Sequence, residues 1–549
     1  ALPWQRSELL LFALRCCAKH VDPRNDAIGA LLSRACAAPL HSLTRRAAID
    51  AFVPLAKWLH AHPASLCFAL QLLISSIVLD VPREMIEFLD THYCLGTHAG
   101  GAMQDPRVMD ASAASVAFRK LCFQSARALA TATPPLLPSL TTAIAPATAE
   151  GRVALHVQLP LFAGIAAIAS HSTNPGAVLV PTVEPMLSLL ARAAAAIARG
   201  EGDPTAAALA LMRVASTLSA VLGAWQDGES GAQWLARGWP TLSEALRAVI
   251  SLPLEASVPL LRALCPAVGA AIAAAGPWTS SESLGEWCRA VQFCWSSVPS
   301  ASCLPKACAS LCACLVVDER RPRGVAESRA RARGVASFLL EMHRAFAVEL
   351  QRGGQLAVRD AANELCDCVH ELFTMTRKIA VAMGAHRGEA IDVAVLRAVL
   401  RNALRCSASQ TREASIAMLK CFTFFVADAA CAGTMKEVLS VDGAHVAHEL
   451  LEGMAGAAPP WVVTEIAHLL FNILKLIGAA DFVTIVRGGF ALCSAKGDAS
   501  YLGGREKGRE VFLTLIVAKK ASLNPTHFKR LCKNLCGGKK SAGKKMKQK

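Results

Sequence analysis

Apolar residues recur at helical spacing from one end of this chain to the other. Two clear examples lie between residues 49 and 59 and between residues 466 and 477, with charged residues off the apolar face. A helix with one apolar face cannot bury that face alone, so each segment needs helical neighbours. The sequence therefore predicts an all-α fold. The two stripes are Ile49, Phe52, Val53, Ala56 and Leu59, and Ile466, Leu469, Leu470, Ile473, Leu474 and Ile477.

Turn signals divide this pattern into separate helices. Asp-Pro and Asn-Pro pairs suit an N-cap followed by the first helical residue, where the missing N–H of proline costs nothing. Their spacing predicts helices of about 12–20 residues, paired antiparallel through short turns. Stacked pairs bury a continuous seam, which favours a HEAT/armadillo-like α-α superhelix over separate helical bundles. The signals are Asp22-Pro23, Asp105-Pro106, Asn174-Pro175, Pro459-Pro460 and Asn524-Pro525.

Composition supports an ordered helical chain in a reducing compartment. The 549 residues are 53% hydrophobic but only 5% aromatic, so Ala, Leu and Val carry the apolar surface. This much apolar side chain offsets the entropy of ordering most of the chain. The 21 Cys are not spaced as a disulfide framework, and the first residues lack the pattern of a secretory leader, so we expect small core residues. Examples are Cys16, Cys36, Cys67, Cys122, Cys406 and Cys421.

The mean hydropathy of +0.38 requires a membrane protein to be considered. The most apolar stretches are residues 159–170, 186–198 and 205–225. The first is shorter than the roughly 20 residues that a spanning helix needs, and a charge near the centre of a span is costly. Arg192 and Arg213 lie near the centres of the other two. We therefore expect no membrane insertion, and several marginal spans remain a third hypothesis.

Changes in composition predict the organisation of the chain. HEAT-like repeats are expected over residues 1–317 and 335–536, separated by a basic connector at 318–334. Residues 497–508 are expected to form an exposed glycine-rich loop, and 537–549 a disordered lysine-rich tail. Residues 511–549 hold eleven Lys and Arg and no acidic residue. Of the net charge of +15, about +4 therefore belongs to residues 1–510.

Two basic clusters are candidate partner-binding sites. The arginine cluster fits an acidic or phosphate-bearing partner, with a solvated loop and helix start as the alternative. The tail fits a nuclear localisation signal, a weak RNA contact, or a solubilising extension. Its neighbours Phe512 and Phe528 are expected in the core rather than as base-stacking residues. The candidates are Arg320, Arg321, Arg323, Arg329, Arg331 and Arg333, and Lys539, Lys540, Lys544 and Lys545.

Catalytic motifs are not found in the sequence. It contains no phosphate-binding loop, metalloprotease helix or nucleophile elbow, and residues 503–508 lack the preceding strand of a phosphate cradle. Cysteines at 303, 308, 312 and 314 match no paired zinc module, so core packing is favoured over metal binding. Histidines at 60, 62, 445 and 448 lack a third ligand at a sensible spacing. We expect no enzymatic activity, no cofactor and no metal site.

Several blocks, read in order, resemble the C-terminal half of importin-β-type nuclear transport receptors, specifically the transportin-3/importin-13 class. Each block alone is weakly specific, and their collinear order over residues 1–536 carries the resemblance. The blocks are Trp4 to Pro23, Leu43 to Ile49, Trp58 to Leu66, Asp110 to Cys122, Trp239 to Leu246, Thr411 to Leu419, and Pro459 to Leu470.

The resemblance implies a helical scaffold that binds protein cargo, contacts Phe-Gly repeats of nucleoporins, and shuttles between nucleus and cytoplasm. In that family the GTPase Ran is bound mainly by N-terminal repeats, which a chain starting in mid-architecture would lack. Transportin-3 reads phosphorylated serine/arginine-rich cargo with an arginine-rich helix. The matching stretch, residues 254–275, has Arg262 as its only basic residue, so this specificity is not transferred.

The alternative hypothesis is a HEAT-repeat scaffold of an RNA-processing or ribosome-biogenesis complex that holds RNA with its tail. In that case, deleting residues 537–549 should abolish a salt-dependent affinity for RNA, because phosphate contacts release counterions. Filter binding of a structureless RNA at several salt concentrations checks this. Equal affinity of the full-length and truncated chains would exclude the tail as an RNA contact.

Overall fold

A computed structural model describes most of the chain. The described residues are 3–36, 41–77, 82–95, 100–131, 153–225, 227–297, 304–315, 325–353, 359–405, 412–457, 462–495, 506–518 and 524–536. Within these ranges the regular structure is helical and no strand occurs. The chain divides into two compact units, Ala1–Leu284 and Gly285–Lys549. The boundary falls inside a helix rather than at the predicted basic connector.

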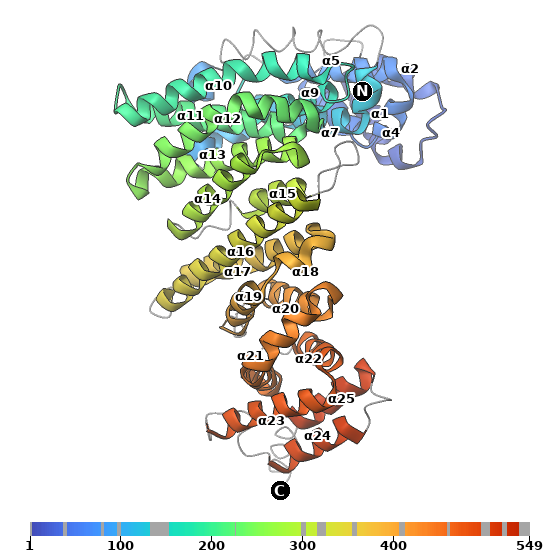
Figure 1. The fold of residues 1–549 in the computed structure, drawn as a ribbon. Coiled ribbons are helices and arrows are strands. Elements are labelled where there is room, and N and C mark those ends of the chain that lie inside the picture. The colour runs from blue at the N-terminus through green and yellow to red at the C-terminus, as the bar shows by residue number, and fades with distance from the viewer. Residues whose placement is uncertain are drawn as a thin grey trace. The chain divides into compact units, whose positions relative to one another are not determined.

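The N-terminal unit contains helices α1 to α13 of Figure 1. Short 3₁₀ turns, η1 (Ala18–His20), η2 (Gly100–Gln104) and η3 (Gly276–Trp278), join some of them. The helices are α1 (Pro3–Cys17), α2 (Ala27–Ala35), α3 (Ser42–Phe52), α4 (Ala56–Ala61), α5 (Pro63–Ile77), α6 (Arg83–Leu95), α7 (Pro106–Ala130), α9 (Leu155–Ala169), α10 (Pro175–Arg199), α11 (Pro204–Ala224), α12 (Gly228–Ile250) and α13 (Leu254–Ala275).

The C-terminal unit begins within α14 (Ser281–Ser297). Its turns include η5 (Gly384–His386), η6 (Ala429–Cys431) and η7 (Gly453–Ala457), the last a π-helical turn. Its remaining helices are α15 (Leu304–Leu315), α16 (Val325–Gly353), α17 (Arg359–Ala382), α18 (Arg387–Ala390), α19 (Val393–Arg405), α20 (Arg412–Ala427), α21 (Ala432–Glu452), α22 (Val463–Ile477), α23 (Ala479–Ala495), α24 (Glu506–Ala518) and α25 (Pro525–Cys536).

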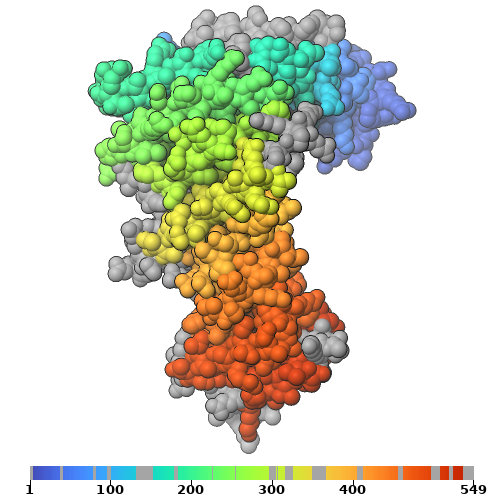
Figure 2. Space-filling view, viewed as in Figure 1, coloured from blue at the N-terminus to red at the C-terminus, as the bar shows by residue number. Residues whose placement is uncertain are grey.

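Each unit is built from two layers of helices that stack along the chain. In the N-terminal unit, α5, α7, α9, α11 and α13 pack in succession in one layer, and α10 packs on α12 in the other. In the C-terminal unit, α15, α17, α20 and α22 form one layer and α16, α19, α21 and α23 the other. The sequence colours of Figure 2 therefore change in successive bands within each unit. This arrangement confirms the predicted helical-repeat solenoid.

The predicted helix signals are largely confirmed. Asp105 and Asn174 cap α7 and α10 by accepting hydrogen bonds from the N–H groups of Arg107 and Ala177, at 2.8 and 3.1 Å. Asn524 caps α25 in the same way at 2.9 Å from the His527 nitrogen. Asp22-Pro23 forms a turn instead of starting a helix, and Pro459-Pro460 lies outside the described residues.

Both predicted apolar stripes are largely buried, but only one of them lies on a single helix. In α22, Ile466, Leu469, Leu470 and Ile473 are buried, as predicted for one continuous helix. The stripe from Ile49 to Leu59 is also mostly buried, but it is divided between α3 and α4. Pro54 lies in the break, where a proline removes a backbone N–H and clashes with the preceding turn.

Several sequence-based boundaries need correction. Residues 325–334 of the predicted connector form the start of α16, a helix of 29 residues that exceeds the predicted length. This segment is rich in Ala and Arg, which are strong helix formers. Residues 506–508 of the predicted loop begin α24. Cys16 is exposed instead of buried, whereas Cys36, Cys122 and Cys421 are buried free thiols and Cys67 is partly buried. Cys406 lies outside the described residues.

Among the described helices, two are long and apolar enough to cross a membrane by length and composition alone, Pro204–Ala224 and Glu255–Trp278. The bent pair Arg412–Ala427 and Ala429–Ala455 would add a third if it formed one span. Within the N-terminal unit, however, Arg213 of α11 forms an ion pair with the buried Asp90 of α6, with 2.6 Å between Nη2 and Oδ2. This charged contact belongs to helix packing inside the unit, and the lack of membrane insertion remains a prediction.

Glycine brings α21 and α23 into close contact. A Cβ atom on Gly489 would lie 2.9 Å from the backbone nitrogen of His448 and 3.1 Å from the carbonyl oxygen of Ala444. A Cβ on Gly488 would lie 2.9 Å from the Cβ of Ala444. The two backbones therefore approach at a distance that a larger residue at these positions does not permit.

A buried histidine links three helices of the C-terminal unit. The side-chain amide of Asn402 donates to the carbonyl oxygen of His343 at 2.7 Å and faces its Nδ1 at 3.2 Å. Nε2 therefore carries the proton and donates to the hydroxyl of Thr376 at 2.9 Å, which in turn donates to the carbonyl of Leu372. Burial lowers the pKa of His343 to about 3. The imidazole is thus neutral in the folded chain.

The close contact between α21 and α23 predicts the effect of Gly489→Ala. The added methyl group meets backbone atoms that cannot rotate away. We therefore expect the free energy of unfolding to fall by roughly 1–3 kcal/mol and hydrogen exchange to become faster in both helices. Exchange mass spectrometry measures this locally. Gly334→Ala in α16 is the control, because a Cβ there meets no atom within 4 Å. It should leave exchange unchanged or slow it.

The neutral His343 predicts a pH-dependent stability. In the unfolded chain its pKa returns to about 6.5, so the unfolded state binds the extra proton first. The contribution of the neutral His343 to the free energy of unfolding is therefore fully present above pH 6.5. It is lost as the pH falls towards 3, at up to about 1.4 kcal/mol per pH unit.

Urea unfolding at several pH values checks this expectation. His343→Gln should flatten the pH dependence of the unfolding midpoint, whereas His527→Gln, at an exposed position, should not. The same pH dependence in both variants would contradict a role for the buried imidazole.

Candidate partner-binding groove

A groove with a volume of about 450 Å³ opens on the N-terminal unit between α3 and α7. Its size lies within the range of roughly 300–1,000 Å³ that is usual for small-ligand sites. The turn η2 closes one side with Met103. We call it the α3–α7 groove. Its lining is Arg46, Ile49, Asp50, Val53, Met103, Val108, Met109, Ser112, Ala113, Val116, Ala117 and Lys120.

The hollow follows from the side-chain sizes on α7. Ser112 and Ala113 are small and lie at the middle of the groove, between the longer Met109 and Val116. Below them, Ile49 of α3 and Val108 and Ala117 of α7 belong to the buried core. The groove is therefore an apolar depression over a packed floor.

A line of exposed apolar side chains continues beyond the groove. Met109, Val116 and Phe123 are 46%, 42% and 38% exposed, and each lies seven residues from the next on α7. Seven residues make almost two helical turns, so the three side chains share one face. Arg119 lies over the ring of Phe123, with 5.4 Å between the guanidinium carbon and the ring centroid. This face is a second apolar stripe, distinct from the buried one.

Charged groups border the groove and hold its helices together. Arg46 donates to the carbonyl oxygen of Met109 at 3.2 Å and lies 3.4 Å from the carboxylate of Asp110. Its Nε is also 3.6 Å from Asp50, which pairs with Arg15 at 3.1 Å. Burial raises the pKa of Asp110, and the hydrogen bond and charge of Arg46 oppose this shift. The border thus presents both signs of charge around an apolar centre.

The predicted arginine cluster does not form one uniform patch among the described residues. On α16, Arg329 pairs with Glu389 of α18, with Nη2 donating to Oε1 at 3.2 Å. Arg331 is buried and pairs with Glu327 one turn earlier, also at 3.2 Å. Arg333 is exposed. Arg320, Arg321 and Arg323 lie outside the described residues, as do the tail lysines Lys539, Lys540, Lys544 and Lys545.

The cysteine and histidine candidates mostly serve packing. Cys308 and Cys314 are buried, Cys312 is partly buried, and Cys303 lies outside the described residues. A hydrogen bond from Cys312 lowers the pKa of Cys308 and raises that of Cys312.

Three of the histidines lie at the surface of the molecule. His60 and His445 are exposed. His62 stacks on Trp58 at 4.1 Å between ring centroids and pairs with Asp26. His448 differs from them in being buried.

Sequence reasoning missed the α3–α7 groove although a signal was present. The apolar residues of α7 exceed what one buried face requires, and Met109, Val116 and Phe123 repeat at an interval of seven. A second stripe at this spacing predicts a second apolar face on one helix. It does not predict the hollow, which depends on α3 and η2 from other parts of the sequence.

No family model matches the sequence, and no curated protein matches it. Among solved structures, the chain is similar to importin-13 in its cytosolic state, with a TM-score of 0.64 and 14% sequence identity. The chain has the fold of the importin-β-type receptors. The likeness covers 97% of this chain and 55% of importin-13, so the chain spans about half the length of that protein. Kap121p is also similar, at 11% identity over 97% of this chain and 68% of its own, with a TM-score of only 0.26.

The importin fold gives the α3–α7 groove a clear structural context. In both units successive helix pairs are added along the chain, so every pair leaves its outer helix surfaces to solvent. The α3–α7 groove is a shallow depression between two such helices. At 14% identity, the likeness to importin-13 establishes the arrangement of helices and not the activity.

Proposed function

We propose that this chain is a cargo-binding part of an importin-type nuclear transport receptor. The observation that carries the proposal is the likeness to importin-13 over 97% of the chain. The helical scaffold binds protein cargo by many weak contacts and shuttles between nucleus and cytoplasm. It acts without catalysis. Ran GTPase is then bound by N-terminal repeats of a longer receptor, as the family resemblance implies.

The α3–α7 groove is the proposed contact for Phe-Gly repeats of nucleoporins. Its apolar centre accepts a phenylalanine ring, and the exposed Met109 and Val116 extend the apolar contact along α7. Burying a phenylalanine side chain contributes about 1.5–3 kcal/mol, which suits a weak and rapidly reversible contact. Rapid release is what a receptor needs when it moves through many such repeats.

Cargo with phosphorylated serine/arginine repeats is not proposed for this chain. In α13, the counterpart of the arginine-rich helix, Arg262 is exposed and is the only basic residue. One guanidinium cannot pair with several phosphoserines at once. Of the arginine cluster, Arg333 offers an exposed guanidinium for an acidic cargo. The lysine-rich tail supports the alternative of an RNA-associated scaffold.

Closing the α3–α7 groove should weaken binding of Phe-Gly peptides. Val116→Glu places a carboxylate at the edge of the apolar centre, where a bound phenylalanine would remove part of its water, so we expect at least about a tenfold loss of affinity. Isothermal titration or NMR with a Phe-Gly repeat peptide measures this. Leu189→Glu in α10 is the matched control, because Leu189 is 45% exposed and lies outside the groove.

Unchanged binding by Val116→Glu, with both variants folded, would assign the peptide to another surface. Binding lost equally in the two variants would show a general effect of added negative charge. Lack of binding by the unmodified chain at millimolar peptide would contradict the pore-binding part of the proposal.

A further inference from the structure

Three metal-binding side chains meet in the interior of the C-terminal unit. His448 and Glu452 lie four residues apart on α21, and Cys493 comes from α23. Their ligand atoms all lie within 4.8 Å of one another. The exposed fractions are 2% for His448, 7% for Glu452 and 0% for Cys493. An imidazole, a carboxylate and a thiol are thus gathered in one buried place.

The two ring nitrogens of His448 lie near different groups. Its Nδ1 lies 3.1 Å from the Sγ of Cys493, so this nitrogen faces the shared space. Its Nε2 lies 3.8 Å from Oε1 of Glu449, which is longer than a direct hydrogen bond. Metal-binding histidines commonly turn their second nitrogen towards a carboxylate, which fixes the ring and the tautomer.

The helix packing holds these groups together without mobile loops. The four-residue interval places His448 and Glu452 on one face of α21. Gly489 lies one turn before Cys493 on α23, and its missing side chain lets the backbone of α23 approach the nitrogen of His448. Rigid helices that meet this closely preserve the spacing of the three ligand atoms.

We propose that His448, Glu452 and Cys493 form a zinc-binding site. Nitrogen, sulfur and oxygen ligands of this kind are those that Zn²⁺ takes in proteins. A thiolate and a carboxylate together carry two negative charges, which the ion balances in a buried setting where unbalanced charge is costly. Three protein ligands leave a fourth tetrahedral position for water or another donor.

A metal here would tie α21 to α23 at the point where α21 ends. Glu452 is the last residue of α21 and the π-helical turn η7 follows directly. The site therefore has a structural role in the C-terminal unit that is independent of cargo and of the α3–α7 groove.

The competing account is an ion network without metal. Arg509 of α24 is buried and donates to the carbonyl oxygen of Phe490 and the hydroxyl of Ser494, which flank Cys493 on α23. A guanidinium in this region offers another counter-charge for the carboxylate and the thiol. The two accounts differ in whether the folded chain retains zinc and loses stability with a chelator.

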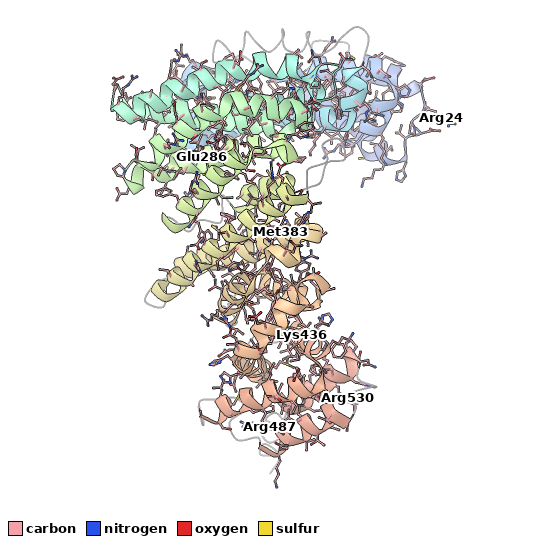
Figure 3. The ribbon with its side chains drawn as sticks, viewed as in Figure 1. Arg24, Glu286, Met383, Lys436, Arg487 and Arg530 are labelled. Atoms are coloured by element: carbon pink, nitrogen blue, oxygen red, sulfur yellow. The ribbon has the colours of Figure 1, made fainter. Side chains whose placement is uncertain are left out.

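Metal analysis of the full-length chain tests the site. After incubation with zinc chloride and dialysis, we expect about one zinc per chain, and cobalt should give the near-ultraviolet absorption of a thiolate ligand. Cys493→Ser should remove the cobalt signal and reduce zinc retention at least about tenfold. Cys421→Ser is the control, because Cys421 is a buried thiol on α20 outside the group. Figure 3 labels the exposed Lys436 and Arg487 on the two helices that carry the site.

Two further measurements keep the test decisive if Cys493→Ser is unstable. A chelator should lower the unfolding temperature of the unmodified chain, and Glu449→Gln should weaken zinc binding by about tenfold while cobalt keeps its thiolate absorption. The proposal would be overturned in favour of the ion network by two results together. The folded, unmodified chain would retain less than about a tenth of an equivalent of zinc, and its unfolding temperature would be the same with and without the chelator.

Discussion

The structure depends on one constraint, which is that no helix of this chain can bury its apolar face by itself. Each apolar face packs mainly on a helix two or three places along the chain. The helices α5, α7, α9, α11 and α13 show this in one unit, and α15, α17, α20 and α22 show it in the other. Such stacking depends on neighbours and not on a single closed core. Each added pair is therefore stabilised locally, and its outer surfaces remain accessible to partners.

This constraint also explains how much of the fold the sequence could predict. Helical spacing and Asp-Pro or Asn-Pro caps are local signals, so α7, α10 and α25 begin where the sequence indicates. Pro54 was an equally local signal that the apolar stripe around it concealed, because the same face is buried on both sides of the break. At residues 325–334, arginine content suggested a connector, whereas the helix propensity of alanine and arginine decided the structure.

The candidate sites were less predictable because their residues come from separate helices. Met109, Val116 and Phe123 share a visible interval of seven, but the groove beside them requires Ile49 and Met103 from elsewhere. His448 and Glu452 form a visible pair at four residues, yet Cys493 is far away in the sequence. Sequence spacing can reveal ligands on one helix. It cannot show which side chain of a later helix faces them.

Glycine and alanine connect the packing to both sites in opposite ways. At Gly489 the missing side chain is filled by a neighbouring backbone, which draws α21 and α23 together around three buried polar groups. Ser112 and Ala113 are half-buried on the groove wall, and their small side chains leave a hollow above them. The same residue sizes therefore yield a closed interior contact or an open surface groove. The difference is whether the next helix in the stack covers that face.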